Sequence, residues 1–204
     1  MTEKFLDKAY QARDAASTRT LYDDWSASYD AEVSENGYAT PKRCAEALAS
    51  FTQDMSAPIL DFGCGTGLSG LALKLAGFEV IDGLDLSADM LAQAESKGVY
   101  RNLAQIEAGS ELSHAPGTYK AIAAIGVIGA GAAPISVFHT LMKGLEAGNR
   151  LVFSFNDHAL EDPRNEAGVA EWLDCGAARL LFKEHGPHLP GIDLGSNVYV
   201  IEKA

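Results

Sequence analysis

Apolar and polar positions alternate along residues 56–204 in a way that predicts strands and helices in turn. The short apolar run PILDFG ends in glycine and predicts a buried strand. TGLSGLALKLAG follows directly with the spacing of a helix that ends at Gly77. FEVIDGLDLS predicts the second strand. SADMLAQAESKG predicts the next helix, with Ser87 as its N-cap and Gly98 after its end.

The alternation continues towards the C-terminus. Strands are expected at 103–108 and in the runs YKAIAAIGVIG and NRLVFSFND, and helices at 134–144 and 164–176. Strands that alternate with helices predict a parallel sheet with helices on both faces. Only a Gly/Pro loop separates the late runs ARLLFKEH and NVYVIEKA. Because this loop is too short for a crossover helix, we expect an antiparallel hairpin.

Residues 1–55 precede any strand signal and are expected to form a helical N-terminal cap or lid. AYQARDAAS and TRTLYDDWSASYDAEV predict two helical pieces, and TPKRCAEALASF a third, whose proline suits a first helical turn. Tyr22, Trp25 and Tyr29 are spaced as one helical stripe, which indicates either core packing or a lid over a site. The chain is long enough for one structural domain, with the cap at 1–55 and an α/β unit at 56–204.

The stretch ILDFGCGTGLSG permits two interpretations. From Gly65 it is a G-x-G-x-x-G dinucleotide fingerprint, and from Asp61 it is an acid followed by glycines at alternate positions. Asp61 would repel the diphosphate of NAD, but it would attract the ammonium of S-adenosylmethionine. Asp85 ends the second strand and can bind ribose hydroxyls of either molecule. The long leading segment and the closing antiparallel pair also favour the methyl donor.

Four elements in order resemble class I S-adenosylmethionine-dependent methyltransferases of the small-molecule type. They are YDDWSASYD, ILDFGCGTGLSG, IDGLDLSADML and GLEAGNRLVFSF. The resemblance covers roughly residues 20–204. It implies a doubly wound seven-stranded α/β sheet of order 3-2-1-4-5-7-6, mostly parallel with a C-terminal antiparallel strand hairpin. It also implies a Rossmann-like methyltransferase domain at 56–204 and S-adenosyl-L-methionine as the cofactor.

The resemblance also assigns a donor site residue by residue. Gly63, Gly65 and Gly67 would line the methionine portion of the donor. Asp61 would lie near its ammonium, and Asp85 would bind its ribose hydroxyls. The other cofactor-binding candidates are Tyr29, Leu86, Ser110 and Gly126.

Methyl transfer from a sulfonium is an in-line displacement, so an enzyme mainly needs alignment and desolvation. A base is needed only when the acceptor arrives protonated. His158 and Asp157, just past the fifth strand, are the catalytic candidates, whereas His185 and His188 are either remote or at the substrate mouth. The segment after the fourth strand has only small and aliphatic residues. A protein that binds the donor or S-adenosylhomocysteine without catalysis therefore stays open.

Charge and composition set the expected partners. A formal net charge of −12 disfavours polyanions, so the expectation is a small-molecule substrate, no nucleic acid and no membrane, in a monomer or homodimer. Glycines and a proline interrupt the apolar run at 121–138, which argues against a membrane span. Three cysteines without a C-x-x-C pair favour a cytoplasmic location, and no metal-ligand spacing is present. The leading hypothesis is a small-molecule methyltransferase, and an NAD-dependent oxidoreductase is the least favoured alternative.

Overall fold

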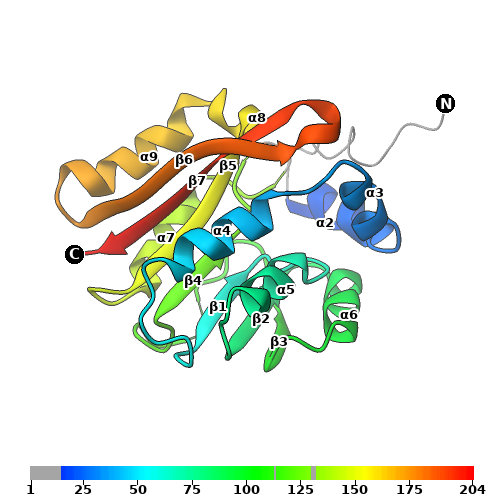
Figure 1. Ribbon diagram of the computed structural model, residues 1–204, viewed down its shortest axis with the longest axis horizontal. Helices are drawn as coiled ribbons and strands as arrows, with labels where there is room; N and C mark the ends of the chain where they lie inside the picture. Colours follow the sequence, from blue (N-terminus) through cyan, green and yellow to red (C-terminus); the bar gives the residue numbers. More distant parts are fainter. Residues whose placement is uncertain (1–14, 113, 130–131) are drawn as a thin grey trace.

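The computed structural model describes residues 15–112, 114–129 and 132–204, which contain one seven-stranded sheet flanked by helices (Figure 1). The strands are β1 (Ile59–Phe62), β2 (Ile81–Asp85), β3 (Asn102–Gln105), β4 (Ala121–Ala124), β5 (Arg150–Asn156), β6 (Ala178–Leu189) and β7 (Leu194–Lys203). Their order is β3-β2-β1-β4-β5-β7-β6. β1 to β5 are parallel, and β7 is antiparallel to both of its neighbours. The predicted fold class and strand order are confirmed.

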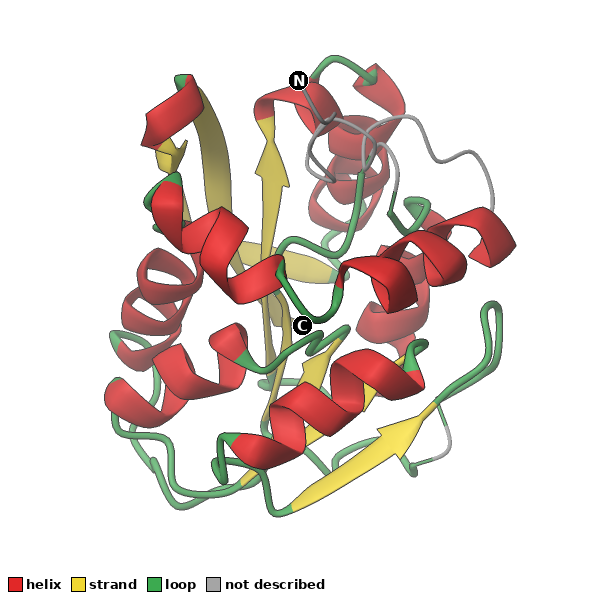
Figure 2. Ribbon diagram, turned by 90° about the vertical axis from the view of Figure 1, so that its right-hand side faces the viewer, coloured by secondary structure: helices red, strands yellow, loops and turns green. Residues whose placement is uncertain are grey.

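Helices cover both faces of the sheet, as Figure 2 shows from the side. The helices are α2 (Ala15–Trp25), α3 (Tyr29–Glu35), α4 (Thr40–Ala49), α5 (Leu68–Leu75), α6 (Ala88–Ser96), α7 (Ser136–Gly144), α8 (Asp157–Leu160) and α9 (Pro163–Asp174), with a 3-10 turn η1 (Pro190–Ile192). Ile59 packs in the core under α4 and α5, whereas the next residue, Leu60, packs in the core under α7 and α9. Successive strand residues point to opposite faces, so each buried strand supplies both cores.

The N-terminal segment differs from its prediction. The helix expected over 18–33 is two helices, α2 and α3, separated by a turn at 26–28. At this turn the Ser26 hydroxyl donates to the backbone oxygen of Asp23, a local hydrogen bond that competes with helical hydrogen bonding. The helix expected in AYQARDAAS lies largely outside the described residues. α4 packs on α5 and β7, and the division of the chain at residue 55 stays a prediction.

Several element ends also differ from their predictions. Ser87 does cap α6, since its hydroxyl accepts a hydrogen bond from the Met90 amide at 3.0 Å. β3 ends at Gln105, earlier than expected. β6 and β7 extend well into the expected Gly/Pro loop, and Pro187 pairs with Gly195. β6 is an edge strand with a register shift at this point, and edge strands tolerate proline.

The described residues of the apolar run at 121–138 include β4 and the first residues of α7. None of the helices in the described part of the chain has both the length and the apolar character needed to cross a membrane.

Candidate active site

The turn between β1 and α5 is built from glycines in a conformation that other residues rarely adopt. Gly63, Gly65 and Gly67 have φ values of 70°, 52° and 92°. The Gly63 amide donates to the Leu84 carbonyl at 2.7 Å, which fixes the turn against β2. A Cβ on Gly63 would lie 2.5 Å from Cγ2 of Val127. The turn therefore requires glycine both for its backbone conformation and for the close approach of the segment after β4.

Asp85, at the end of β2, is held in place by two backbone amides. Its Oδ2 accepts from the Gly65 amide at 2.8 Å, and its Oδ1 accepts from the Ser87 amide at 2.9 Å. Burial raises the pKa of Asp85, although these backbone hydrogen bonds oppose the effect. Each carboxylate oxygen keeps acceptor capacity, so the pair can bind two neighbouring hydroxyls. This arrangement is compatible with the predicted contact to a ribose.

Asp61 is completely buried behind the glycine turn. Its Oδ2 accepts from the Ser69 hydroxyl at 2.6 Å and from the Tyr100 hydroxyl at 2.7 Å. Its Oδ1 has no hydrogen-bond partner among the described residues. Burial raises the pKa of Asp61 to about 6, although the hydrogen bonds from Ser69 and Tyr100 act in the opposite direction. Asp61 does not line the cavity described next, but Ser69 does, so a direct contact of Asp61 with a donor ammonium stays a prediction.

A cavity of about 1190 Å³ lies at the carboxyl ends of the central strands. This is the edge at which open α/β sheets bind ligands. The predicted site residues on its wall are Tyr29, Gly63, Gly65, Asp85, Leu86, Ser110, Gly126 and His158. Gly67, Asp61 and Asp157 are not on the wall. Gly67 instead caps α5 at its N-terminus.

Some apolar side chains on the cavity wall were not predicted. Besides Leu86, the wall includes Met90 and Ile106, which come from α6 and from the segment after β3. The Ser110 hydroxyl donates to the Glu107 carbonyl at 2.7 Å. Apolar side chains next to polar groups suit a flat heteroaromatic ring. Met90 and Ile106 follow ordinary apolar periodicity, so no sequence signal separates them from core residues.

The N-terminal helices are bound to the glycine turn by polar contacts that sequence reasoning missed. Asp30 in α3 accepts from the Thr66 hydroxyl at 2.5 Å and from Lys97 Nζ at 2.7 Å. Asp23 in α2 accepts from the Ser87 hydroxyl. Figure 1 shows α2 and α3 beside the end of α6. These contacts place Tyr29 on the cavity wall.

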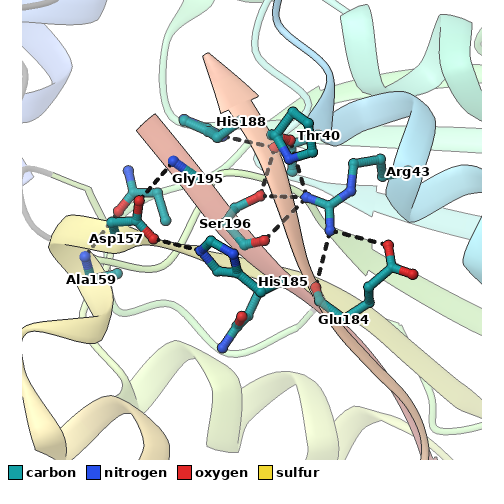
Figure 3. Close-up of polar contacts among 12 residues, drawn as sticks. Thr40, Arg43, Asp157, Ala159, Glu184, His185, His188, Gly195 and Ser196 are labelled. Atoms are coloured by element: carbon teal, nitrogen blue, oxygen red, sulfur yellow. Dashed lines mark hydrogen bonds and ion pairs between the residues drawn. The ribbon is translucent and has the colours of Figure 1, made fainter. Parts of the chain in front are cut away.

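The two predicted catalytic residues have different surroundings. Asp157 binds the β6–β7 hairpin: His185 Nε2 lies 2.9 Å from its Oδ1, and the Gly195 amide donates to its Oδ2 at 2.7 Å (Figure 3). Burial opposes ionisation of Asp157, but these hydrogen bonds outweigh it and lower the pKa. His158 does line the cavity, and its Nδ1 lies 3.5 Å from Glu161. Asp157 therefore anchors the hairpin, whereas His158 can meet a ligand.

A smaller recess of about 60 Å³ adjoins the cavity. The residues that line both the cavity and the recess include Tyr22, Tyr29, Tyr38 and Gly126. The recess also contains His188, which sequence reasoning left either remote or at the substrate mouth. Over residues 15–112, 114–129 and 132–204, no group of three or more His, Cys, Asp or Glu side chains could hold a metal ion.

Comparisons with known proteins agree with this architecture. Residues 59–148 match a family described as a methyltransferase domain. Methyltransferase-like protein 27 of Homo sapiens is 33% identical over 139 residues, which is 65% of this chain and 56% of that protein. The 18S rRNA (guanine(1575)-N(7))-methyltransferase of Saccharomyces cerevisiae is 32% identical over 126 residues, which is 55% of this chain and 46% of that protein. The chain thus spans about half the length of the curated relatives it matches.

Solved structures share the fold at low sequence identity. One is the complex between the Haloferax volcanii Trm112 methyltransferase activator and a methyltransferase. The match has a TM-score of 0.69 and 15% identity, and covers 91% of this chain and 97% of that chain. Another is a Thiobacillus denitrificans S-adenosylmethionine-dependent methyltransferase in complex with S-adenosylhomocysteine. That match has a TM-score of 0.56 and 13% identity, and covers 79% and 91% of the two chains.

These matches correct the expected partners. The expectation of a small molecule alone, without nucleic acid, conflicts with a relative that is an rRNA methyltransferase and with a neighbour in complex with an activator protein. The expectation was wrong because it rested on net charge. Net charge averages the whole chain and does not describe the field at one site. Residues 59–148 match a methyltransferase domain family, and the chain shares its fold with solved methyltransferase structures.

Proposed function

We propose that this protein transfers a methyl group from S-adenosyl-L-methionine to an acceptor by in-line displacement. The observation that carries the proposal is the pairing of Asp85 with the Gly65 amide at the mouth of the large cavity. This contact holds an acidic side chain and a tight glycine turn together. The turn permits close approach of a ligand to backbone, and the carboxylate can accept hydrogen bonds from hydroxyls.

The residues of the site fit this donor. The cavity is large enough for a nucleoside with an amino-acid tail, and the apolar side chains on its wall suit an adenine. The buried Asp61 keeps one oxygen without a hydrogen-bond partner among the described residues. That oxygen contributes negative potential behind the turn, which favours a cationic ligand. When bound, the donor supplies a methyl group that is already activated on a sulfonium.

The protein's own residues then have to align the donor with the acceptor and exclude water. Tyr22 and Tyr29 lie on the walls of both the cavity and the recess, so the aromatic cap residues stand where the two spaces meet. An aromatic face near a sulfonium adds cation–π attraction on the order of 1 kcal/mol. We assign Tyr29 to this role.

His158 is the residue we propose as a general base, for an acceptor that arrives protonated. It lies on the cavity wall at the start of α8. Asp157 has no such role in the proposal, because both of its oxygens are engaged with the β6–β7 hairpin.

The acceptor we propose carries a compact reactive group that enters the recess, either in a small molecule or in RNA. The recess volume of about 60 Å³ supports a compact group. A relative named as an rRNA methyltransferase makes RNA the other acceptor to test. We also propose a cytoplasmic location. Cys44 and Cys64 are free and buried, and free thiols fit a reducing compartment.

A transfer assay tests the proposal. The protein is incubated with S-adenosylmethionine labelled on its methyl group, and with either a small-molecule extract or total RNA from the same cells. Label should enter one of the two fractions, and Asp85→Asn should reduce the incorporation at least tenfold. Asp89→Asn is the matched control, because Asp89 is exposed on α6 outside the cavity wall. Binding of the donor without transfer to either fraction would instead support the non-catalytic binding protein.

A further inference from the structure

The recess beside the donor cavity has aromatic walls and a single histidine. Its lining residues are Tyr22, Trp25, Tyr29, Val33, Tyr38, Gly126, Ile128, Gly129, Ala132, Ser154, Asn156, His188 and Leu189. None of these residues is Lys, Arg, Asp or Glu. His188 is buried, and burial lowers its pKa to about 4, so the ring is neutral at physiological pH. Among the described residues, the side chains that line the recess are therefore uncharged, and several are aromatic.

A chain of hydrogen bonds leads from Arg43 to His188 (Figure 3). Arg43 Nη1 donates to the Ser196 hydroxyl at 3.0 Å. The Ser196 and Thr40 hydroxyl oxygens are 2.9 Å apart, and the Thr40 oxygen is 2.7 Å from Nδ1 of His188. Ser196 and Thr40 are completely buried, so their hydrogens must find partners within the protein.

The direction of this chain follows from its first member. A guanidinium only donates, so the Ser196 oxygen accepts from Arg43 and its own hydrogen is directed to Thr40. Thr40 then donates to Nδ1 of His188. The opposite direction would leave the buried Ser196 hydroxyl hydrogen without an acceptor in the chain. Nδ1 is therefore an acceptor, and a neutral His188 carries its proton on Nε2.

Nε2 is the part of His188 that remains for a ligand. Among the described residues, no hydrogen bond involves Nε2, and the ring lines the recess. The neighbouring ring of Tyr38 meets the imidazole edge to face, with centroids 5.2 Å apart. A protonated Nε2 cannot take a proton from an acceptor, so His188 contributes a hydrogen-bond donor and not a base.

We propose that the recess binds the methyl acceptor, and that His188 selects it by donating a hydrogen bond from Nε2 to an oxygen or nitrogen of a neutral heteroaromatic ring. This inference rests on the proposed function. Tyr29 and Gly126 line both the recess and the donor cavity, which places the two ligands side by side. The recess holds about four water-sized groups, so it takes one edge of a ring. The ring belongs either to a free compound or to a base in RNA.

The tautomer of His188 is the first test, and it is independent of ligand binding. Long-range ¹H–¹⁵N spectra of the histidine-labelled protein distinguish the two protonation sites. We expect His188 to carry its proton on Nε2 at pH 7, and Thr40→Val to remove that preference. A wild-type protein with the proton on Nδ1 would overturn the inference.

Binding of a probe is the second test. 1-Methyl-2-pyridone is neutral, planar and accepts hydrogen bonds, and it is titrated with saturating S-adenosylhomocysteine present. His188→Phe keeps a ring but removes the donor, so the Kd of the probe should rise at least tenfold while the Kd of S-adenosylhomocysteine changes less than twofold. His139→Phe is the matched control, because it makes the same change on α7, outside the walls of the recess and of the cavity. Benzoate and benzyltrimethylammonium should bind more weakly than the pyridone.

The outcomes separate the two proposals. If S-adenosylhomocysteine binds but the pyridone binds equally well to wild type and His188→Phe, or to neither, the inference about the recess is wrong and the proposed function stands. If S-adenosylhomocysteine does not bind, the proposed function is wrong, and the inference is wrong with it. A guanine-containing RNA oligonucleotide that binds at least tenfold tighter than guanosine assigns the ring to RNA. Equal affinities assign it to a free compound.

Discussion

The Thr66 hydroxyl in the glycine turn donates a hydrogen bond to the carboxylate of Asp30 in α3, at a distance of 2.5 Å. The same carboxylate pairs with Lys97 Nζ at 2.7 Å, and Lys97 also donates to the Thr66 carbonyl. The three residues connect the cap, the turn and the end of α6. The Asp30 carboxylate is therefore one of the contacts that hold the cap over the donor cavity, together with the contact between Asp23 and Ser87.

Removing that carboxylate should loosen the cap. Asp30→Ala deletes a charge-assisted hydrogen bond and a partly exposed ion pair, which together contribute about 1–2 kcal/mol. We expect S-adenosylhomocysteine to bind roughly 5- to 30-fold more weakly, mainly through faster dissociation. Stopped-flow displacement measures the dissociation rate. Asp24→Ala is the control, because Asp24 is exposed on α2. Equal rates in wild type and Asp30→Ala would contradict a role for Asp30 in closing the cap.

Asp85→Asn should weaken donor binding by about 10- to 100-fold, since it loses a charge-assisted contact and leaves an amide group facing a backbone N–H. Calorimetry with S-adenosylmethionine measures the change in Kd, and Asp89→Asn should match wild type. An unchanged Kd in Asp85→Asn would remove Asp85 from the donor site.

Asp61→Asn should remove a pH dependence of stability and weaken donor binding. Burial raises the pKa of Asp61 from 3.8 to about 6, so the folded protein binds more protons than the unfolded chain between these values. The free energy of unfolding therefore falls as pH rises through this window, by about 3 kcal/mol from this group. Asp61→Asn should lose that decrease and should bind S-adenosylmethionine more weakly. Urea unfolding at pH 4 and pH 7 measures the first effect. If the free energy of unfolding of Asp61→Asn still falls by the full amount between pH 4 and pH 7, Asp61 is not the group responsible.

His188 should produce the opposite pH dependence. Its folded pKa of about 4 lies below its ordinary 6.5, so the unfolded chain binds more protons between these values. The contribution of His188 to the free energy of unfolding is fully present above pH 6.5. This contribution, about 3 kcal/mol, is lost as the pH falls towards 4. Urea unfolding of wild type and His188→Phe across this window measures the difference. The loss should be smaller in the variant, and identical profiles would show that His188 is not buried and neutral.

Much of the fold could be predicted from the sequence because its signals are local. The apolar runs, the glycines at helix ends and the short connection between β6 and β7 each act within a few residues. Ser87 is an example, since it caps α6 within one turn of its own position. The break between α2 and α3 was missed because helical periodicity does not register local turn hydrogen bonds such as the one from Ser26.

The polar contacts of the site could not be predicted in the same way. Thr66 and Asp30 are 36 residues apart in sequence, and Thr40 and His188 are 148 apart. Such pairs depend on where whole elements pack. The register of β6 on β7 places His188 in the recess. The same hairpin binds Asp157, which therefore does not line the cavity.

The central claim is that the glycine turn and Asp85 bind a methyl donor, and calorimetric titration with S-adenosylmethionine, S-adenosylhomocysteine and NADH in parallel tests it most directly. We predict saturable binding of the first two ligands and none of NADH. Binding of NADH alone would contradict the claim and would make the G-x-G-x-x-G interpretation of this turn the correct one.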